Sequence, residues 1–404
     1  MGLKVAVIGG GAAGFFAAIS CKHHHADAAV TIFEKSDKLL AKVKISGGGR
    51  CNVTHACFQN SQLAKFYPRG EKQLKKLFNH FSTQDTVDWY ESRGVQLKTE
   101  ADNRMFPVTD DSQSIIDCLM AEVRRLNVTI KTKSPVLKVS PQDEGFQLEL
   151  KTGSTHFDKV IIATGGSPKL AGFDWLAQLG HDIVAPVPSL FTFNMPGNPV
   201  RKLMGLSVPN AQVKVQGTKL VQQGPLLITH WGMSGPAILK SSAWGARVLH
   251  ELNYDFTAQV NWLPEFKEDD LRSWYTENKG QLSKRKVKNK NPFQLPSRLW
   301  DFLLDKVEID GELAWQDLGK KSLNRLINIL LNDTYEVHGK TTFKEEFVTA
   351  GGVALADIDF NTMQSRKCPG LYFAGEVMNV DGVTGGFNFQ AAWSSGFLAG
   401  KISG

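Results

Sequence analysis

Three glycines near the N-terminus have the spacing of a dinucleotide-binding turn. Gly9, Gly11 and Gly14 follow an apolar, β-branched run at 4–8 and precede an apolar run at 15–22. The two runs predict a buried parallel strand and a helix. In such a unit Gly9 permits the turn, Gly11 lets the backbone approach a pyrophosphate, and Gly14 lets strand and helix pack closely. Free N–H groups at the start of the helix would bind the phosphates.

An acidic residue follows at the distance that this motif requires. A second predicted strand, at 29–33, ends at Glu34, which lies 20 residues after Gly14. An acid at this point binds the ribose hydroxyls of an adenosine. A glycine turn alone is weak evidence, but the strand, the helix and the acid together predict a dinucleotide site.

A glycine-rich segment comes next. Residues 42–52 read Lys-Val-Lys-Ile-Ser-Gly-Gly-Gly-Arg-Cys-Asn. Three consecutive glycines predict a loop whose backbone can lie against a flat or charged group. Ser46, Arg50 and Asn52 add polar groups for a phosphate, a ribityl chain or a flavin ring, and a flexible surface turn is the alternative. Cys51 is a candidate for contact with a flavin, although burial as a small apolar residue is the commoner role.

Two later strands also end in glycine-bearing turns. Ala163-Thr164-Gly165 ends a predicted strand at 160–163, and Gly375-Glu376 ends one at 370–374. Cofactors lie across the carboxyl ends of parallel strands, so both ends of the chain are expected to contact one ligand. A nicotinamide site needs only the first glycine turn, and the second set therefore indicates FAD.

The last motif opens a predicted helix that runs to Gly400. It reads Gly385-Gly386-Phe387-Asn388. The N-terminus of this helix would stabilise the negative charge of a reduced flavin. No general base is identified. The candidates are His230, whose imidazole titrates near neutral pH, together with Arg50 and Cys51, and a structural histidine is the commoner case.

The elements that position these motifs predict an α/β fold. We expect more than one domain, because single cores stop growing near about 250–300 residues and the chain has 404. One is a Rossmann-like FAD-binding domain with a parallel sheet and a β-meander. Its segments are 1–190 and 343–404. Residues 191–262, with about 331–342, alternate as strands and predict an inserted β-rich domain. Residues 263–330 predict a helical insert. Helical spacing extends over 71–93, and strand character over 343–353.

Composition narrows the class of protein. The five cysteines are odd in number and contain no Cys-x-x-Cys, which fits a reducing cytoplasm better than a disulfide framework. No apolar run reaches the roughly 20 residues that span a bilayer, and no metal site is expected. The formal charge of +7 is compatible with an anionic cofactor and does not require nucleic acid. The basic run at 284–290 is typical of a solvated loop and has no interleaved aromatic residues.

These motifs resemble a known family, the BaiN-like flavoproteins, which includes the aminoacetone oxidases. The resemblance rests on Val-Ile-Gly-Gly-Gly-Ala-Ala-Gly, Ile-Ser-Gly-Gly-Gly-Arg-Cys-Asn, Thr-Ala-Gly-Gly-Val and Phe-Ala-Gly-Glu-Val, and extends over nearly all 404 residues. It implies a glutathione-reductase-type FAD fold with two inserted lobes, and it leaves the substrate open. The FAD contacts that it implies are Ala13, Glu34, Lys35, Arg50, Asn52, Ala163, Thr164, Glu376, Gly386, Phe387 and Asn388. With the motif residues the predicted site also includes Gly9, Gly11, Gly14, Lys42, Ser46, Gly47, Gly48, Val136, Gly165, Gly375 and Gly385.

We therefore expect an FAD-dependent oxidoreductase that passes a hydride between a small molecule and flavin N5. The substrate could be an amine such as aminoacetone, with oxygen as acceptor, or NAD(P)H could serve as donor. No second glycine fingerprint predicts a nicotinamide domain. Neither a membrane nor nucleic acid is expected as a partner. Two alternatives stay open: a flavin-dependent RNA-modifying protein, because of the basic run at 284–290, and a binding protein whose FAD is structural.

Overall fold

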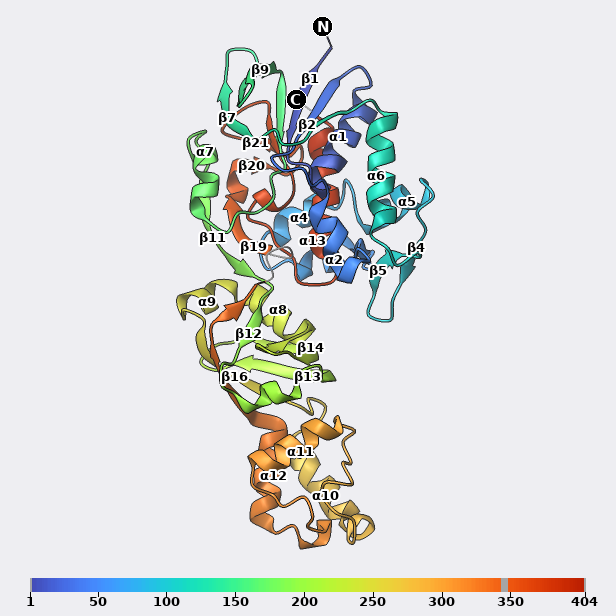
Figure 1. Cartoon of the computed structure of the whole chain (residues 1–404), viewed down its shortest axis with the longest axis vertical. Coiled ribbons are helices and arrows are strands. Elements are labelled where there is room, and N and C mark those ends of the chain that lie inside the picture. Colours follow the sequence, from blue (N-terminus) through green and yellow to red (C-terminus); the bar gives the residue numbers. More distant parts are fainter. Residues whose placement is uncertain (1, 343–347, 403–404) are drawn as a thin grey trace. The chain divides into compact units, whose positions relative to one another are not determined.

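The computed structural model describes residues 2–342 and 348–402. The chain divides into two compact units. Unit 1 comprises residues 1–189 and 343–404, and unit 2 comprises residues 190–342 (Figure 1). The segment 343–347 of the predicted strand at 343–353 lies outside the described residues, and the remainder forms β19, Val348–Val353.

Unit 1 is built on a seven-stranded sheet in the order β20-β21-β22-β10-β1-β2-β6. Five neighbouring strands of this sheet are parallel: β1 (Lys4–Ile8), β2 (Ala29–Phe33), β6 (Thr129–Lys131), β10 (Lys159–Ile162) and β22 (Leu371–Phe373). The short strands β20 (Ile358–Asp359) and β21 (Gln364–Ser365) add an antiparallel edge. The residues Val5–Val7 and Val160–Ile162 are fully buried, as expected of a sheet that is covered on both faces.

The first and last long helices pack together, α1 (Ala12–His24) against α13 (Phe387–Gly400). Their contact includes the rings of Phe16 and Trp393, whose centroids are 5.2 Å apart. The other helices of unit 1 are α2 (Ala41–Gly49), α3 (Asn60–Leu63), α4 (Glu71–Leu77), α5 (Thr83–Glu91), α6 (Gln113–Arg125) and α7 (Asp174–Ala177). The N- and C-terminal segments therefore form one core.

Three smaller antiparallel sheets complete unit 1. They are β3-β5-β4 (Thr54–His55, Arg104–Pro107 and Leu97–Thr99), the meander β7-β8-β9 (Val136–Pro141, Phe146–Leu150 and Gly153–Phe157), and β11 (Ile183–Ser189) with β19. The α/β class and the Rossmann-type parallel sheet that the sequence predicted are confirmed.

The prediction of helix across 71–93 is wrong between α4 and α5. Residues 78–82 break the helix, and α5 begins with a capping box in which Ser82 and Asp85 bond each other's backbone and side chain. The carboxylate of Asp85 accepts hydrogen bonds from the backbone N–H and the hydroxyl of Ser82. These bonds are typical of the start of a helix, so a new helix begins after Ser82. Apolar spacing continues across this break because both helices pack on the same core.

Unit 2 contains a seven-stranded sheet in the order β17-β16-β13-β14-β15-β12-β18. Its strands are β12 (Thr192–Asn194), β13 (Ser207–Val215), β14 (Val221–Ile228), β15 (Gly232–Ser234), β16 (Asp255–Asn261), β17 (Asp333–His338) and β18 (Lys340–Thr341). Its helices are α8 (Pro236–Trp244), α9 (Ala246–Glu251), α10 (Glu268–Leu282), α11 (Ser297–Lys306) and α12 (Lys320–Asn332). Sheet and helices share one hydrophobic core that includes Trp262, Trp300 and Trp315. No helix within residues 2–342 and 348–402 is both long and apolar enough to span a membrane.

Candidate functional site

The glycine turn joins β1 to α1 and leaves one side of the backbone open. A Cβ on Gly14 would lie 2.0 Å from the carbonyl oxygen of Gly9, so this glycine is required for the strand and helix to approach. A Cβ on Gly11 would meet nothing within 4 Å. The N-terminus of α1 and the free space at Gly11 therefore form a cradle that an anionic group can occupy.

Glu34 lies at the end of β2 beside this turn. Its Oε2 accepts a hydrogen bond of 2.9 Å from the backbone N–H of Gly10, and its Oε1 accepts from the N–H and hydroxyl of Ser36 at 2.8 and 2.9 Å. Lys35 is exposed next to it. The N–H of Ser134 donates to the carbonyl of Glu34, and Val136 begins the meander two residues later. Fixed donors thus hold the carboxylate at the edge of the glycine turn.

Two more strand ends lie at the same edge of the sheet. Backbone bonds from Ala163 to Ile8 and from Ala374 to Ile162 continue the parallel ladder to the last residue of each strand. Gly375 is tied to α13, since its N–H donates to Ser395 Oγ at 2.9 Å. Thr164 and Gly165 follow β10. Thr164 is exposed, and Gly165 is half-buried.

Glu376 connects three segments at this edge. Its Oε1 accepts from the N–H and hydroxyl of Thr349 at 2.9 and 3.0 Å, and its Oε2 lies 2.6 Å from Lys42 Nζ. Thr349 belongs to β19 and Lys42 to α2. The carboxylate that the sequence placed near a ribose or ribityl chain is therefore oriented by a strand and a helix on either side of it.

The glycine-rich segment departs from helix geometry within the bounds of α2. Ser46 leaves helix geometry with a ψ of 148°, and Gly47 and Gly48 have positive φ of 59° and 70°. The loop then reaches the start of α13 through Asn52. With its amide oriented to satisfy both neighbours, Asn52 donates to the carbonyl of Thr54 at 3.0 Å and accepts from the N–H of Gly386 at 2.9 Å. The loop and the final helix therefore form one continuous wall.

The loop that precedes α13 is closed by Asn388. Its Oδ1 accepts from the N–H of Gly382 at 2.8 Å, and its Nδ2 donates to the carbonyl of Gly382 at 3.0 Å. Phe387 is buried and stacks on Phe66, with ring centroids 4.4 Å apart. Both predicted contact residues thus hold the backbone of 382–388 in place.

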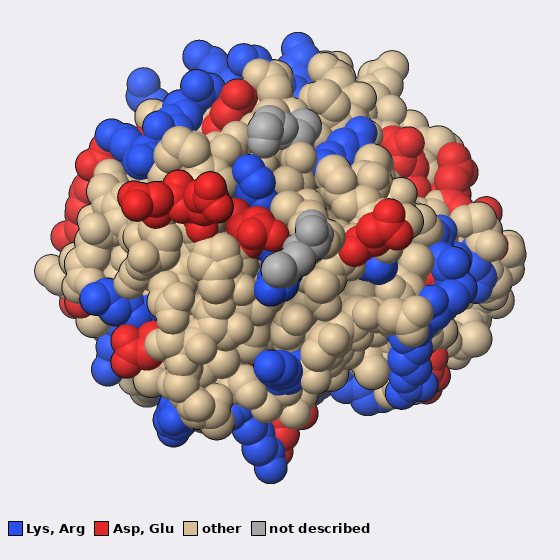
Figure 2. Space-filling view, turned by 90° about the horizontal axis from the view of Figure 1, so that it is seen from above, with Lys and Arg blue, Asp and Glu red and all other residues tan. Residues whose placement is uncertain are grey.

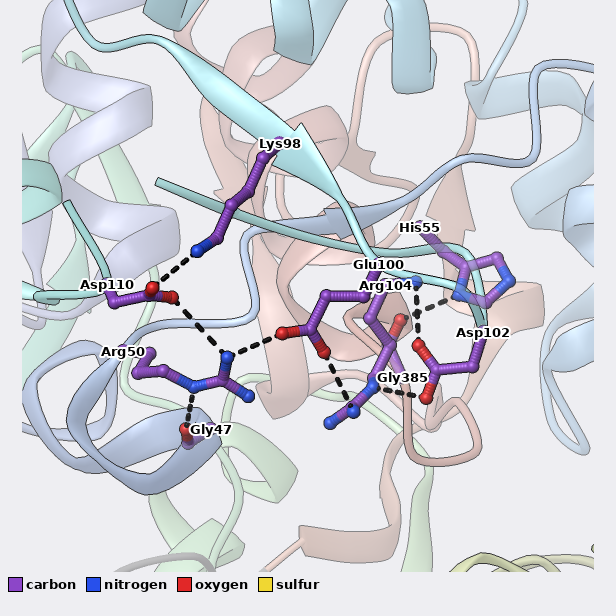
Figure 3. A network of polar contacts seen from close by, with 9 residues as sticks. All are labelled: Gly47, Arg50, His55, Lys98, Glu100, Asp102, Arg104, Asp110 and Gly385. Atoms are coloured by element: carbon purple, nitrogen blue, oxygen red, sulfur yellow. Dashed lines mark hydrogen bonds and ion pairs between the residues drawn. The ribbon is translucent and has the colours of Figure 1, made fainter. Parts of the chain in front are cut away.

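Arg50 points toward a group of charged residues on the sheet β3-β5-β4 (Figure 3). Its guanidinium lies 2.6 Å from Glu100 Oε1 and 3.4 Å from Asp110 Oδ1, and it covers the ring of Phe106 at 4.0 Å. Lys98 also pairs with Asp110, while Arg104 pairs with Glu100 at 3.0 Å and with Asp102 at 2.7 Å. Hydrogen bonding to Glu100 is the main cause that raises the pKa of Arg50. This network anchors the glycine-rich loop from outside.

A family model described as HI0933-like protein Rossmann domain matches residues 3–402. The chain belongs to the HI0933-like family. The ribosomal RNA dihydrouridine synthase of Escherichia coli is 32% identical over 98% of this chain and 96% of that protein. The 3-dehydro-bile acid delta(4,6)-reductase of Clostridium scindens is 26% identical over 99% and 98%.

A solved structure of similar fold is 3-ketosteroid-delta4-(5alpha)-dehydrogenase from Rhodococcus jostii RHA1 in complex with 4-androstene-3,17-dione. It has a TM-score of 0.51 and 13% sequence identity, and the alignment covers 99% of this chain and 97% of that one. This likeness concerns the fold alone. The resemblance to BaiN-like flavoproteins is confirmed, and the HI0933-like chain is an FAD-dependent oxidoreductase. The open cradle at Gly11 and the carboxylates at Glu34 and Glu376 fit that cofactor.

The predicted catalytic candidates lie in different surroundings. Cys51 is fully buried, and burial raises the pKa of its thiol to about 12, so it is a neutral thiol at working pH. His230 is exposed in the loop between β14 and β15 of unit 2, where its ring lies 4.6 Å from that of Trp231. Arg50 is engaged with Glu100 and Asp110. A catalytic role for any of them stays a prediction.

Sequence reasoning missed two residues beside the start of α13. His55 Nδ1 lies 3.1 Å from the carbonyl oxygen of Gly385, and its ring centroid lies 4.6 Å from that of Phe387. Asp381 is fully buried, forms a two-point ion pair with Arg69, and accepts from Ser189 Oγ at 2.8 Å. Burial raises the pKa of Asp381, and Arg69 opposes that shift. The only local signal for either was a polar residue near a glycine turn.

Proposed function

We propose that this HI0933-like protein is an FAD-dependent reductase that saturates a carbon–carbon double bond conjugated with a carbonyl group. The proposal is supported by what the two full-length relatives have in common. A dihydrouridine synthase makes uridine whose ring double bond, conjugated with a carbonyl, has been reduced. A 3-dehydro-bile acid delta(4,6)-reductase acts on double bonds conjugated with a 3-oxo group. The substrates differ in size and charge, while the reacting unit is the same.

The residues that we propose to hold FAD follow the cofactor from one end to the other. Gly9, Gly11, Ala13 and Gly14 would face the pyrophosphate, and Glu34, Lys35 and Val136 the adenosine. The remaining contacts would come from Lys42, Ser46, Gly47, Gly48, Arg50, Asn52, Ala163, Thr164, Gly165, Gly375, Glu376, Gly385, Gly386, Phe387 and Asn388. Once reduced by a donor such as NADH or NADPH, the bound flavin would supply a hydride to the β carbon of the conjugated system, and a proton added at the α carbon would complete the reduction.

The start of α13 suits a cofactor that gains negative charge on reduction. The helix is 14 residues long and begins at Phe387, directly after Gly386, whose φ of 92° turns the chain into it. Its dipole carries roughly half a positive charge at this end. Asn52 and Asn388 hold the backbone around that end through the bonds to Gly386 and Gly382. Donors that are fixed before reaction stabilise developing charge without reorganising.

The reductive direction is tested in two half-reactions. Purified protein is loaded with FAD, and NADH, NADPH and aminoacetone are each mixed with it without oxygen. Bleaching of the flavin band near about 450 nm identifies the donor. The reduced protein is then mixed with 2-cyclohexenone, a 4-en-3-one steroid, uridine and a uridine-containing RNA. Return of colour together with a product heavier by about 2 Da identifies the acceptor.

The outcomes separate this proposal from its competitors. Bleaching by NADH or NADPH followed by reoxidation with a conjugated carbonyl supports it. Bleaching by aminoacetone, with oxygen as the sole effective oxidant, contradicts it and indicates an amine oxidase. Failure of all donors and acceptors would leave a protein in which the flavin is structural.

A further inference from the structure

One surface of unit 2 combines exposed aromatic rings from one loop with cations from two other segments. We call it the Trp231 patch; it consists of Arg201, Lys202, His230, Trp231 and Arg298. Arg201 and Lys202 lie in a short helical turn, Pro199–Leu203. His230 and Trp231 form the loop between β14 and β15, and Arg298 lies in the first turn of α11. None of the sequence motifs above includes these residues together.

The patch is held together by bonds to the backbone. Arg201 Nε donates to the carbonyl oxygen of His230 at 2.6 Å, and an Nη of Arg298 donates to the carbonyl oxygen of Lys202 at 2.8 Å. Each guanidinium donates one hydrogen bond to a backbone carbonyl of a neighbouring segment. Because this acceptor is neutral, the contact does not compensate the positive charge of the arginine. The three segments are therefore fixed relative to one another within unit 2.

Hydrogen bonds also hold the backbone of the aromatic loop. Thr229 Oγ1 accepts from the N–H groups of Trp231 and Gly232 at 3.3 and 3.2 Å. Gly232 has a φ of 155°, and a Cβ there would lie 2.2 Å from the carbonyl oxygen of Phe193. The indole of Trp231 is nevertheless 43% exposed and leans on the ring of His230. A large aromatic ring that is exposed on a hydrogen-bonded loop is a platform on which a flat group can stack.

The cations of the patch differ from those of the basic run at 284–290. Within the described residues, Arg201, Lys202 and Arg298 form no ion pair, whereas Lys286 lies 2.6 Å from Glu312 and Lys288 pairs with the same carboxylate. Unit 2 carries 20 Lys and Arg against 15 Asp and Glu, so it holds most of the net charge of +7. On the face drawn in Figure 2, basic and acidic side chains lie among one another.

We propose that the Trp231 patch binds an unpaired RNA strand, with phosphates on Arg201, Lys202 and Arg298 and a base stacked on Trp231. Three cations from two segments, beside an exposed aromatic ring, match a ligand with several phosphates. Stacking bases on exposed aromatic rings between basic side chains is the usual way to bind single strands. The proposal rests on the proposed function, because the uracil ring is a conjugated carbonyl compound that RNA would present.

The test uses the full-length, FAD-loaded protein and a fluorescein-labelled, uridine-rich single strand of about 12 nucleotides. Anisotropy gives the dissociation constant at several salt concentrations. The variant K202Q/R298Q removes two patch charges, and K286Q/K288Q removes two charges that are already paired with Glu312. W231A removes the ring alone. Flavin absorbance and thermal unfolding of each variant establish that it is folded.

The wild type should bind more tightly as salt falls. K202Q/R298Q should weaken binding at least about tenfold and reduce the slope of log K against log salt by about 1.4, since each single-strand phosphate contact contributes about 0.7. W231A should weaken it by about tenfold with the slope unchanged, because stacking carries no counterions. K286Q/K288Q should change binding by less than about threefold.

Equal losses of RNA affinity in the two double variants, or no RNA binding at low salt, overturn the proposal for the patch. The proposal is also overturned if the protein binds vesicles that contain an anionic lipid, in a way that depends on the patch residues, but does not bind RNA. Reduction of 2-cyclohexenone by the wild type is measured in parallel. RNA binding at the patch without reduction of any conjugated carbonyl sinks the proposed function and leaves the patch intact, while reduction without RNA binding sinks the patch alone.

Discussion

Lys42 and Glu376 meet in an ion pair of 2.6 Å although 334 residues separate them. Glu376 also accepts two hydrogen bonds from Thr349, so one carboxylate joins α2, β19 and the end of β22. The pair lies at the carboxyl edge of the parallel sheet, where Glu34 and the glycine turn also lie. The site is thus closed by contacts between the two ends of the chain.

Replacing Glu376 by alanine should weaken FAD binding. A lost hydrogen bond to a charged group is worth about 1.5–3 kcal/mol, so we expect the dissociation constant to rise by about 10- to 100-fold. Flavin fluorescence quenching measures it. E312A removes the acid of an exposed ion pair in unit 2 and should leave FAD affinity unchanged. An E376A protein that binds FAD like the wild type would exclude this carboxylate as a contact.

Two glycines of one turn should respond differently to alanine. Gly11 has φ and ψ of −95° and −172°, which any residue adopts, and open space beside it. G11A should therefore unfold at nearly the same temperature as the wild type without cofactor, yet bind FAD more weakly by at least about tenfold, because the methyl group occupies the cradle.

G14A should instead destabilise the cofactor-free protein, since its Cβ would overlap the carbonyl of Gly9. Overpacking of this kind costs about 1–3 kcal/mol or more. Thermal unfolding followed by circular dichroism compares the two variants. Equal loss of stability in both would contradict the open cradle at Gly11.

Two glutamates with the same low pKa should differ in their effect on stability. Hydrogen bonding to Arg125, with further help from Arg93, lowers the pKa of Glu122 from 4.5 to about 2. Since the folded pKa is depressed, this stabilisation is complete above about pH 4.5 and is lost as pH falls toward about 2. At neutral pH the free energy of unfolding of E122Q should be about 2 kcal/mol lower than that of the wild type. This value allows for solvent screening around the exposed Arg125.

The difference between E122Q and wild type should narrow below about pH 4.5, as followed by urea unfolding. Glu312, whose pKa Lys286 and Lys288 also lower to about 2, is exposed. E312Q should therefore leave the free energy of unfolding nearly unchanged at every pH, because water and salt screen the pair. A pH-independent cost for E122Q would refute the linkage.

Among the five cysteines, Cys57 should react first with iodoacetamide. It is half-buried, whereas Cys21, Cys51, Cys118 and Cys368 are buried. Burial raises the pKa of Cys51 to about 12, so little thiolate is available there. Peptide mass spectrometry gives the order of labelling. C51A should keep the rate of flavin reduction within about threefold of the wild type, and a much slower variant would restore a redox role for this thiol.

The strand–glycine turn–helix unit and the acid after it could be predicted because all its parts lie within 34 residues. The need for a glycine at Gly14 and the burial of β1 both depend on residues that are close together in the chain. Short sequence patterns can therefore predict them. The parallel sheet and the FAD cofactor were predicted from three strands that each end in a glycine-bearing turn.

The break between α4 and α5 could not be predicted, since apolar spacing ran on across it and only the bonds of Ser82 with Asp85 stop the helix. The orientation of the Arg50 side chain could not be predicted either. It depends on Glu100 and Asp110, which are 50 and 60 residues away. Nothing near Arg50 in the chain distinguishes a cofactor contact from an anchor on a neighbouring sheet.

The sequence by itself determined the type of cofactor and predicted the segments that we propose to surround it, because dinucleotide binding uses backbone shapes that short motifs encode. Only the tertiary structure decided which side chains face one another: Glu376 with Lys42 and Thr349, Asn52 with Gly386, and Arg201 with the loop of Trp231. Such contacts join residues far apart in the chain. Their energies depend on distances that folding creates, and no local pattern carries them.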